Sequence, residues 1–238
     1  MEQPKRVIVV GVGGIGSWLV PPLCRLLAYK KYAGEVWLCD GDKFEPHNAD
    51  RQDVGEGLGM NKAEAMCDRI FHDLPNLRQR CLPEFLTEGN VAGLIAEDSI
   101  VLIAVDNHPA RALIAGHAQT LRNVVVLTAG NELYDGNVHV YRRGGGKDKT
   151  GPLSDRHPEA FNSNEGNRAA MSCEQLAQEG EPQLLVTNFM AATALLCAFW
   201  GVMEAEVLKR RKISPAQEIY FDIRRAAMIM VPAPGRGA

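Results

Sequence analysis

The sequence lacks paired cysteines. Its six cysteines are scattered singly along the 238 residues, at Cys24, Cys39, Cys67, Cys81, Cys173 and Cys197. A disulfide framework is not expected in a chain of this length, and a structural zinc site would need ligand pairs that the sequence does not contain. We therefore expect no zinc, and the cysteine usage fits a reducing compartment, the cytoplasm.

The sequence also lacks a strong excess of either charge and a long apolar run. Its formal net charge of −3 gives no broad attraction to nucleic acid or to an anionic membrane. No apolar run reaches the ~20 residues that span a bilayer, and residues 1–6 leave no room for a signal peptide before a β-rich run. These absences predict a cytoplasmic protein that binds neither nucleic acid nor a membrane.

The sequence does contain a regular alternation of short apolar runs and helical segments. We expect strands at residues 6–10, 35–40, 80–82, 99–105, 124–128, 136–141, 218–223 and 226–231, and helices at 17–31, 61–74, 109–121 and 182–212. Near-continuous apolar strands need cover on both faces. The pattern therefore predicts an α/β, Rossmann-like, doubly wound fold with a mostly parallel sheet, helices on both faces and antiparallel C-terminal strands.

Two stretches depart from this alternation. Pro21 and Pro22 should kink the first helix or shorten its regular part. Residues 142–170 are rich in glycine and polar residues, and we expect them to form a long crossover loop. The whole chain, 1–238, then forms one domain, with a nucleotide-binding half at about 1–130 and a C-terminal half at about 171–238.

A glycine-rich turn, GVGGIG at residues 11–16, follows the first predicted strand and opens the first predicted helix. Gly11 permits the tight turn, Gly13 lets backbone N–H groups approach a phosphate, and Gly16 allows the helix to pack on the strand. The helix N-terminus adds partial positive charge. Asp40, at the end of the second strand, is placed to accept hydrogen bonds from ribose hydroxyls. This pattern predicts nucleotide binding, and NAD, FAD and ATP all fit it.

The polar residues after Asp40 favour ATP. Arg51 and Lys62 can neutralise phosphate charge, and Asp106 ends an apolar strand at the edge where open α/β sheets bind their ligands. Two cations, one carboxylate and a glycine cradle suit a triphosphate with Mg²⁺. The alternatives are structural: Arg51 could pair with a neighbouring aspartate, Lys62 could be an ordinary surface lysine, and Asp106 could cap the next helix.

The motifs GVGGIGS, DGDKFEPHNADRQ, GMNKAEA and AVDN, followed by Arg111, occur in this order between residues 7 and about 111. In them the sequence resembles the ThiF/MoeB/E1 superfamily, most closely its compact bacterial, plasmid or phage-associated branches. These enzymes adenylate the C-terminus of ubiquitin-like proteins. The resemblance implies that adenosine and phosphates are held by Gly11, Gly13, Gly14, Gly16, Asp40 and Asp42, the phosphates by Asn48, Arg51, Gln52 and Lys62, and Mg²⁺ by Asp106.

The implied reaction is attack by a glycine carboxylate of a small ubiquitin-like or sulfur-carrier protein on the α-phosphate of ATP. Arg51, Lys62 and Asp106 would act in that step. The element Met171-Ser172-Cys173-Glu174 resembles the one that supplies an acyl-accepting cysteine, so Cys173 is either a nucleophile that forms a thioester or a structural thiol.

The sequence departs from bacterial relatives in two ways. The two CxxC pairs that often hold zinc are missing, and the N-terminal helix that carries an arginine into the neighbouring subunit's ATP site has no counterpart. A homodimer therefore stays open. Two other functions also stay open, an NAD(P)- or FAD-linked oxidoreductase and a non-catalytic E1-like scaffold subunit.

Overall fold

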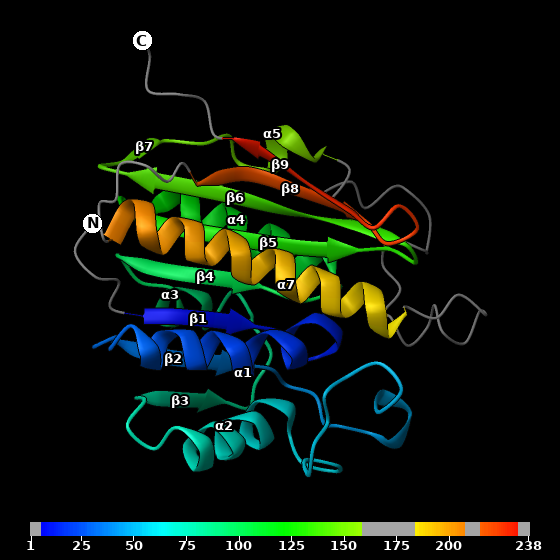
Figure 1. The fold of residues 1–238 in the computed structure, drawn as a ribbon. Helices are drawn as coiled ribbons and strands as arrows, with labels where there is room; N and C mark the ends of the chain where they lie inside the picture. Colours follow the sequence, from blue (N-terminus) through cyan, green and yellow to red (C-terminus); the bar gives the residue numbers. More distant parts are fainter. Residues whose placement is uncertain (1–5, 159–183, 208–214, 233–238) are drawn as a thin grey trace.

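The computed structural model describes residues 6–158, 184–207 and 215–232. Within these ranges nine strands form one sheet in the order β3-β2-β1-β4-β5-β6-β8-β9, with β7 paired to β6 (Figure 1). The strands are β1 (Arg6–Val10), β2 (Glu35–Cys39), β3 (Gln79–Leu82), β4 (Ser99–Ile103), β5 (Val124–Asn131), β6 (Asp135–Gly144), β7 (Lys147–Asp148), β8 (Ala216–Asp222) and β9 (Ala227–Pro232).

The sheet has a parallel and an antiparallel part. Strands β3, β2, β1, β4 and β5 run parallel to one another. From β5 onward each strand is antiparallel to its neighbour, through β6, β8 and β9. The predicted Rossmann-like sheet with antiparallel C-terminal strands is confirmed.

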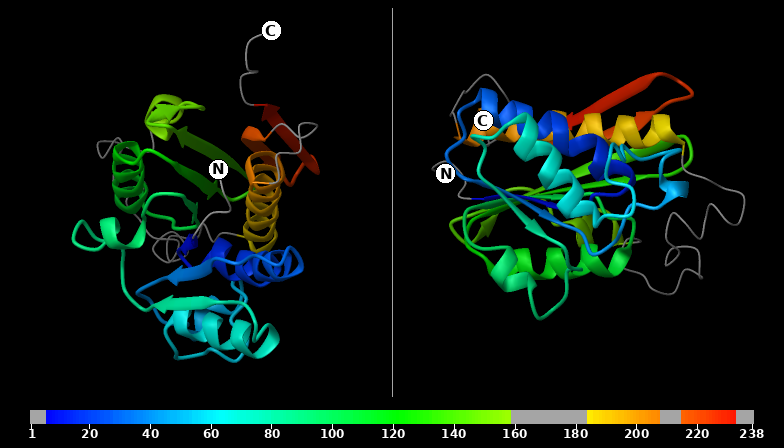
Figure 2. Two further views of the ribbon diagram at one scale, coloured as in Figure 1. Left: turned by 90° about the vertical axis from the view of Figure 1, so that its left-hand side faces the viewer. Right: turned by 90° about the horizontal axis from the view of Figure 1, so that it is seen from below.

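Helices cover both faces of the sheet, as predicted (Figure 2). They are α1 (Gly14–Tyr29), α2 (Lys62–Asp73), α3 (Val91–Leu94), α4 (His108–Thr120), α5 (Leu153–Arg156) and α7 (Leu185–Val202), with a 3₁₀ turn at Pro46–Asn48 and a π turn at Met203–Val207.

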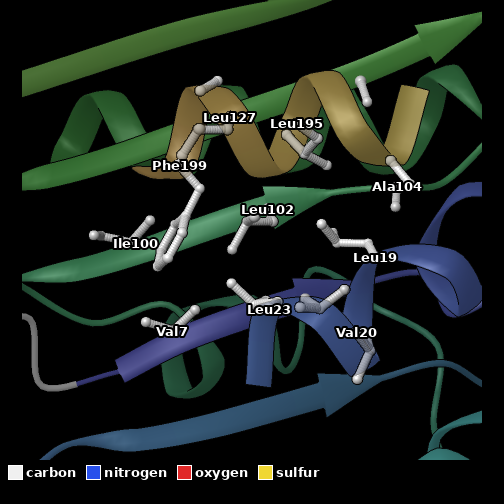
Figure 3. Close-up of a cluster of buried hydrophobic side chains, with 14 of the residues drawn as sticks. Val7, Leu19, Val20, Leu23, Ile100, Leu102, Ala104, Leu127, Leu195 and Phe199 are labelled. Atoms are coloured by element: carbon white, nitrogen blue, oxygen red, sulfur yellow. The ribbon is translucent and has the colours of Figure 1, made fainter. Parts of the chain in front are cut away.

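Each face of the sheet has its own apolar core, because alternate residues of a strand point to opposite faces. Val7 and Val9 of β1 pack with α1, α2 and α7, whereas Ile8 and Val10 pack with α3 and α4. In the first core, Leu23 of α1 and Phe199 of α7 meet over β1 and β4 (Figure 3). Helix α7 thereby joins the parallel and antiparallel parts of the sheet into one layer.

Three expectations about individual segments are wrong. Helix α1 runs without interruption through Pro21 and Pro22, so the two prolines do not shorten it. Residues 142–158 are not a structureless loop. They complete β6, form the short hairpin with β7, and include α5. The turn glycines Gly145 and Gly146, both with positive φ, made this hairpin look like a loop.

The third correction concerns α7. Residues Leu185–Ala205 form a segment of 21 residues whose most apolar stretch has a mean hydropathy of 1.7, enough by length and composition to cross a membrane. From the sequence we expected no apolar run long enough to span a bilayer. More than half of its most apolar stretch is buried inside the molecule. A core helix that packs on a sheet has this composition.

Candidate nucleotide-binding site

A large cleft lies at the carboxyl ends of β1, β2, β4 and β5. Its volume is about 1160 Å³. Strand β1 pairs with β2 on one side and β4 on the other, so the strand order reverses at β1. Open α/β sheets bind their ligands at such a switch point. The cleft therefore lies where the fold alone would place a ligand.

The glycine turn forms the floor of this cleft. Gly11 has φ +91°, and a side chain there would meet the backbone of Ala104. A Cβ on Gly16 would overlap the carbonyl oxygen of Gly11, so Gly16 is required for the turn to pack against the helix that it opens. A Cβ on Gly13 would instead reach toward Gln52 Nε2 and Lys62 Nζ, each 3.9 Å away. Gly13 thus keeps open a space between polar side chains.

Asp40 fixes the turn from the end of β2. Its Oδ2 accepts a hydrogen bond from the N–H of Val12 at 2.6 Å, and its Oδ1 accepts one from the N–H of Asp42 at 2.9 Å. Burial raises the pKa of Asp40, while these two hydrogen bonds and the charge of Lys62 lower it. Besides any contact with a ribose, this carboxylate holds the glycine turn against the loop after β2.

Arg51 is buried, with only 7% of its surface exposed. Its Nε atom is buried and has no hydrogen-bond partner. Of the two neighbouring aspartates that could have paired with Arg51, Asp50 and Asp53, the second is paired instead with Arg69 at 2.8 Å. A buried guanidinium nitrogen without a partner costs free energy unless a ligand satisfies it.

Gln52 and Lys62 lie beside Arg51 and face the same space. Gln52 is buried and its Oε1 has no hydrogen-bond partner. Lys62 is also buried, at the start of α2, with its Nζ 3.5 Å from a carboxylate oxygen of Asp42. Lys62 is therefore not an ordinary surface lysine. Asn48 is buried too, but its Oδ1 accepts the N–H of Glu45 and so stabilises the local turn.

Asp106 lies in the cleft after β4 and is exposed. It does not cap helix α4. The cap is Asn107, whose Oδ1 accepts the N–H of Ala110 at 2.9 Å. Arg111, from the same helix, donates to the carbonyls of Val105 and Ala129 and so ties the end of β4 to β5. Among the described residues no group of three acidic, histidine or cysteine side chains could hold a metal alone.

The structure brings together in one cleft nearly all of the site residues expected from the sequence: Gly11, Gly13, Gly14, Asp40, Asp42, Asn48, Arg51, Gln52, Lys62 and Asp106. Gly16 does not line the cleft; it acts in packing. Cys173 lies outside the described residues.

Several cleft residues were not expected. Asn137, His139, His157 and Tyr220 line the end of the cleft that lies over β6 and β8. The alternation along β6, where residues 135, 137 and 139 share one face, was the only signal for two of them. Phe85 was also missed; its ring packs against Gly41 and is largely exposed in the cleft.

The geometry fits a polyphosphate. Backbone N–H groups at the start of α1, two buried cations, a buried amide and the open space over Gly13 converge at one end of the cleft. Together with the sheet order, this defines the chain as a Rossmann-like nucleotide-binding α/β protein. The ThiF family model matches residues 3–217, and the chain belongs to that family.

Named relatives agree with this assignment. The chain is 31% identical over 198 residues to the sulfur carrier protein adenylyltransferase of Thermus thermophilus, covering 82% of this chain and 70% of that protein. It is 31% identical over 128 residues to the tRNA threonylcarbamoyladenosine dehydratase of Escherichia coli, covering 52% of this chain but only 46% of that protein. The expected resemblance to the ThiF/MoeB/E1 superfamily is confirmed.

Solved structures share the fold. The E. coli dehydratase in complex with AMP superposes with a TM-score of 0.60 at 20% identity, covering 85% of this chain and 87% of that one. E. coli MccB with ATP superposes with a TM-score of 0.65 at 18% identity, covering 98% of this chain and 64% of that one.

Proposed function

We propose that the protein uses ATP to adenylate the C-terminal glycine carboxylate of a small ubiquitin-like or sulfur-carrier protein. The observation that carries the proposal is Arg51, which is buried, lines the same cleft as Gly13 and Lys62, and has an Nε atom without a hydrogen-bond partner. An arginine could also bind the pyrophosphate of a redox cofactor, but hydride transfer develops no charge on a phosphate and would not use the group in its reaction step. The family membership and the adenylyltransferase names of relatives support the same class of enzyme.

In the proposed reaction, a carboxylate oxygen of the partner attacks the α-phosphorus of ATP. An acyl–oxygen–phosphorus linkage forms, the bond from the α-phosphorus to the bridging oxygen breaks, and pyrophosphate leaves with that oxygen. Arg51 and Lys62 hold the phosphates and stabilise the charge that develops on them. Gly13 leaves room for the triphosphate against the N-terminus of α1.

Mg²⁺, when bound with the triphosphate, would neutralise part of its charge. Magnesium commonly takes one or two protein carboxylates with phosphate and water oxygens, so the single carboxylate of Asp106 in the cleft fits this role. The exposed ring of Phe85, packed on Gly41, offers an apolar surface for the adenine at the end of β2.

ATP–pyrophosphate exchange tests the proposal. The assay uses the wild-type protein, a purified β-grasp protein that ends in Gly-Gly, and the Arg51→Ala variant. An arginine that acts on a transferring phosphate contributes ~10³–10⁵ in rate, so Arg51→Ala should reduce exchange by at least ~10³. Arg69→Ala is the matched control, since Arg69 lies on α2 and pairs with Asp53, which is in the same loop as Arg51. Near-normal exchange by folded Arg51→Ala protein would contradict the proposal.

A thioester on Cys173 is the second step that we propose. The thiolate would attack the acyl carbon of the adenylate, form the carbon–sulfur bond and release AMP. Among the cysteines of the described ranges, Cys24 and Cys39 are buried, and burial raises the pKa of each thiol to about 12. Such thiols stay protonated and make poor nucleophiles.

An ATP-dependent conjugate that a thiol reductant cleaves is the expected product. It should be lost in Cys173→Ala and kept in Cys197→Ala, where the exposed Cys197 serves as the control thiol. A conjugate retained in Cys173→Ala would exclude this step and leave adenylation untouched.

We also propose a homodimer. Support comes from exposed apolar side chains on α7 (Phe189 and Trp200) and on the edge strand β9 (Ile229 and Met230). Light scattering on the purified protein tests this proposal, and a monomer at micromolar concentration would exclude it. The cytoplasmic location and the absence of nucleic-acid binding remain predictions.

A further inference from the structure

Helix α7 carries two polar side chains that are completely buried in its first turn, Thr187 and Asn188. The rest of the helix is strongly apolar. Buried polar groups cost free energy unless they are paired, so each should have a specific partner. Thr187 donates from its hydroxyl to the carbonyl of Leu133 at 2.7 Å and so fixes the β5–β6 turn. Asn188 points elsewhere, toward Gly14 and the backbone carbonyl of Arg51.

The carboxamide of Asn188 connects three segments of the chain. Its Oδ1 accepts a hydrogen bond from Asn131 Nδ2, at the end of β5, at 3.0 Å. Its Nδ2 donates to the backbone carbonyl of Arg51 at 3.4 Å. The Nε1 of Trp18, from α1, donates to the same carbonyl at 3.1 Å. The backbone of Arg51 is thus held from α1 and from α7.

Asn188 also lies directly against the glycine turn. A Cβ built on Gly14 would lie 2.9 Å from Asn188 Nδ2 and 3.1 Å from Asn188 Oδ1, and no other residue's atoms are among the three nearest. Gly14 therefore allows the carboxamide to sit between the start of α1 and the Arg51 loop. The same side chain sets the position of both phosphate-binding elements.

The backbone and the side chain of Arg51 differ in their hydrogen bonding. The carbonyl of Arg51 is bonded twice, while its Nε is buried without a partner. A fixed backbone with an uncommitted head group is what a preorganised anion site requires, because no binding energy is then spent on ordering the loop. We infer that Asn188 is a positioning residue that fixes the backbone of Arg51 relative to the glycine turn, so that the guanidinium group is available to the triphosphate. This inference rests on the proposed use of ATP.

The test measures the affinity for ATP by calorimetry, which needs no partner protein. Asn188→Ala removes the donor to the Arg51 carbonyl, and the loss of one hydrogen bond of ordinary strength predicts ATP binding weaker by about 5- to 10-fold. In an Arg51→Ala background the same substitution should change the affinity less than about 2-fold, since there is no guanidinium left to position. An equal loss in both backgrounds would overturn the inference, because a purely structural role acts on both.

Thr187→Val is the matched control. It removes a buried hydrogen bond from the same helical turn without touching Arg51 or Gly14, so it should lower the melting temperature and leave the ATP affinity within about 2-fold. A loss of affinity equal to that of Asn188→Ala would also overturn the inference.

Trp18→Phe gives a second route to the same test, should Asn188→Ala fail to fold. It removes the other hydrogen bond to the Arg51 carbonyl while Asn188 and Gly14 stay in place, and its effect on ATP affinity should likewise vanish in the Arg51→Ala background. ATP–pyrophosphate exchange is measured in parallel. Wild-type protein that binds ATP but shows no exchange would count against adenylation and leave the positioning role to be judged from the affinities.

Discussion

The two ends of the cleft differ in how far their charged side chains are buried and paired. At the end formed by parallel strands, Arg51 is 7% exposed and its Nε has no hydrogen-bond partner. At the end formed by antiparallel strands, the cleft-lining carboxylates of Asp222 and Asp135 are paired with Arg224, whose side chain is 55% exposed. The first arginine is buried with spare hydrogen-bonding capacity, and the second is solvated and already paired.

The same difference extends to the neighbouring side chains. Gln52 Oε1 also lacks a partner, whereas in the antiparallel end Tyr220 donates to Glu218 at 2.7 Å and Asn137 lies 3.3 Å from a ring nitrogen of His157. Burial without a partner is costly, and it persists where a ligand repays it. The contrast therefore assigns phosphate binding to the parallel end and leaves the antiparallel end to shape the cleft.

The largest effect should come from the floor of the parallel end. In Gly16→Ala the new Cβ would overlap the carbonyl oxygen of Gly11, a backbone atom that cannot move away without opening the turn. We expect no folded protein, by soluble yield and circular dichroism. Gly93→Ala in α3 is the control, because no atom lies within 4 Å of its Cβ position and stability should be kept. A stable Gly16→Ala protein would show that the turn does not need this close approach.

The next largest effect that we expect is a loss of stability at low pH, caused by His139 at the antiparallel end. His139 is buried, and burial lowers its pKa from 6.5 to about 4. In the unfolded chain the imidazole takes up a proton near pH 6.5, so its contribution to stability is complete above that pH and is lost as the pH falls toward 4. A pKa shift of this size corresponds to a loss on the order of 3 kcal/mol in the free energy of unfolding.

Urea unfolding at pH 7 and pH 4.5 measures this loss. His139→Gln, which cannot be protonated in this range, should lose less stability between the two pH values than the wild type. Equal losses would mean that other groups dominate the acid sensitivity and that His139 is not held neutral by burial.

The third effect returns to the phosphates. Lys62→Met keeps the buried aliphatic stem but removes the ammonium group 3.5 Å from Asp42. Loss of a hydrogen bond to a charged partner predicts ATP binding weaker by ~10- to 100-fold, with the melting temperature of the free protein little changed. Asp42→Asn is the control, because it removes the same ion pair but keeps the ammonium group of Lys62. Calorimetry compares the ATP affinities of the two variants. ATP affinity unchanged in Lys62→Met would remove Lys62 from the site.

The parallel end could be predicted from the sequence because its residues follow strands that had to be parallel and buried. Asp40 and Asp106 come directly after apolar runs, and parallel strands bring their carboxyl ends to one edge. Arg51 and Lys62 lie within a short distance along the chain of those strands. The local sequence pattern was therefore enough to predict which residues lie at this end of the cleft.

The rest depends on contacts between distant residues. Asn188 lies 137 positions from Arg51, in a segment whose composition indicates only a core helix. His157 lies in the glycine-rich stretch that looked like a loop but forms a hairpin and a short helix. His139 lies on a strand that was predicted, but its position in the cleft was not. The alternation along β6 places Asn137 and His139 on one face of the strand, but it does not show that this face lines the cleft. Their role follows from the tertiary packing of α7 and β6.

The smallest effect should come from Arg224, and it completes the comparison with Arg51. Arg224 makes its ion pairs in solvent, and such pairs contribute roughly 0–1 kcal/mol. Arg224→Ala should therefore shift the free energy of unfolding by less than about 1 kcal/mol and ATP–pyrophosphate exchange by less than about 2-fold. Arg51→Ala should do the reverse, with little change in stability and a loss of exchange of at least ~10³. If Arg224→Ala instead reduced exchange by more than tenfold, the antiparallel end would take part in the reaction. The exposure and the ion pairing of an arginine would then not distinguish Arg51, which we propose to act on the phosphates, from Arg224.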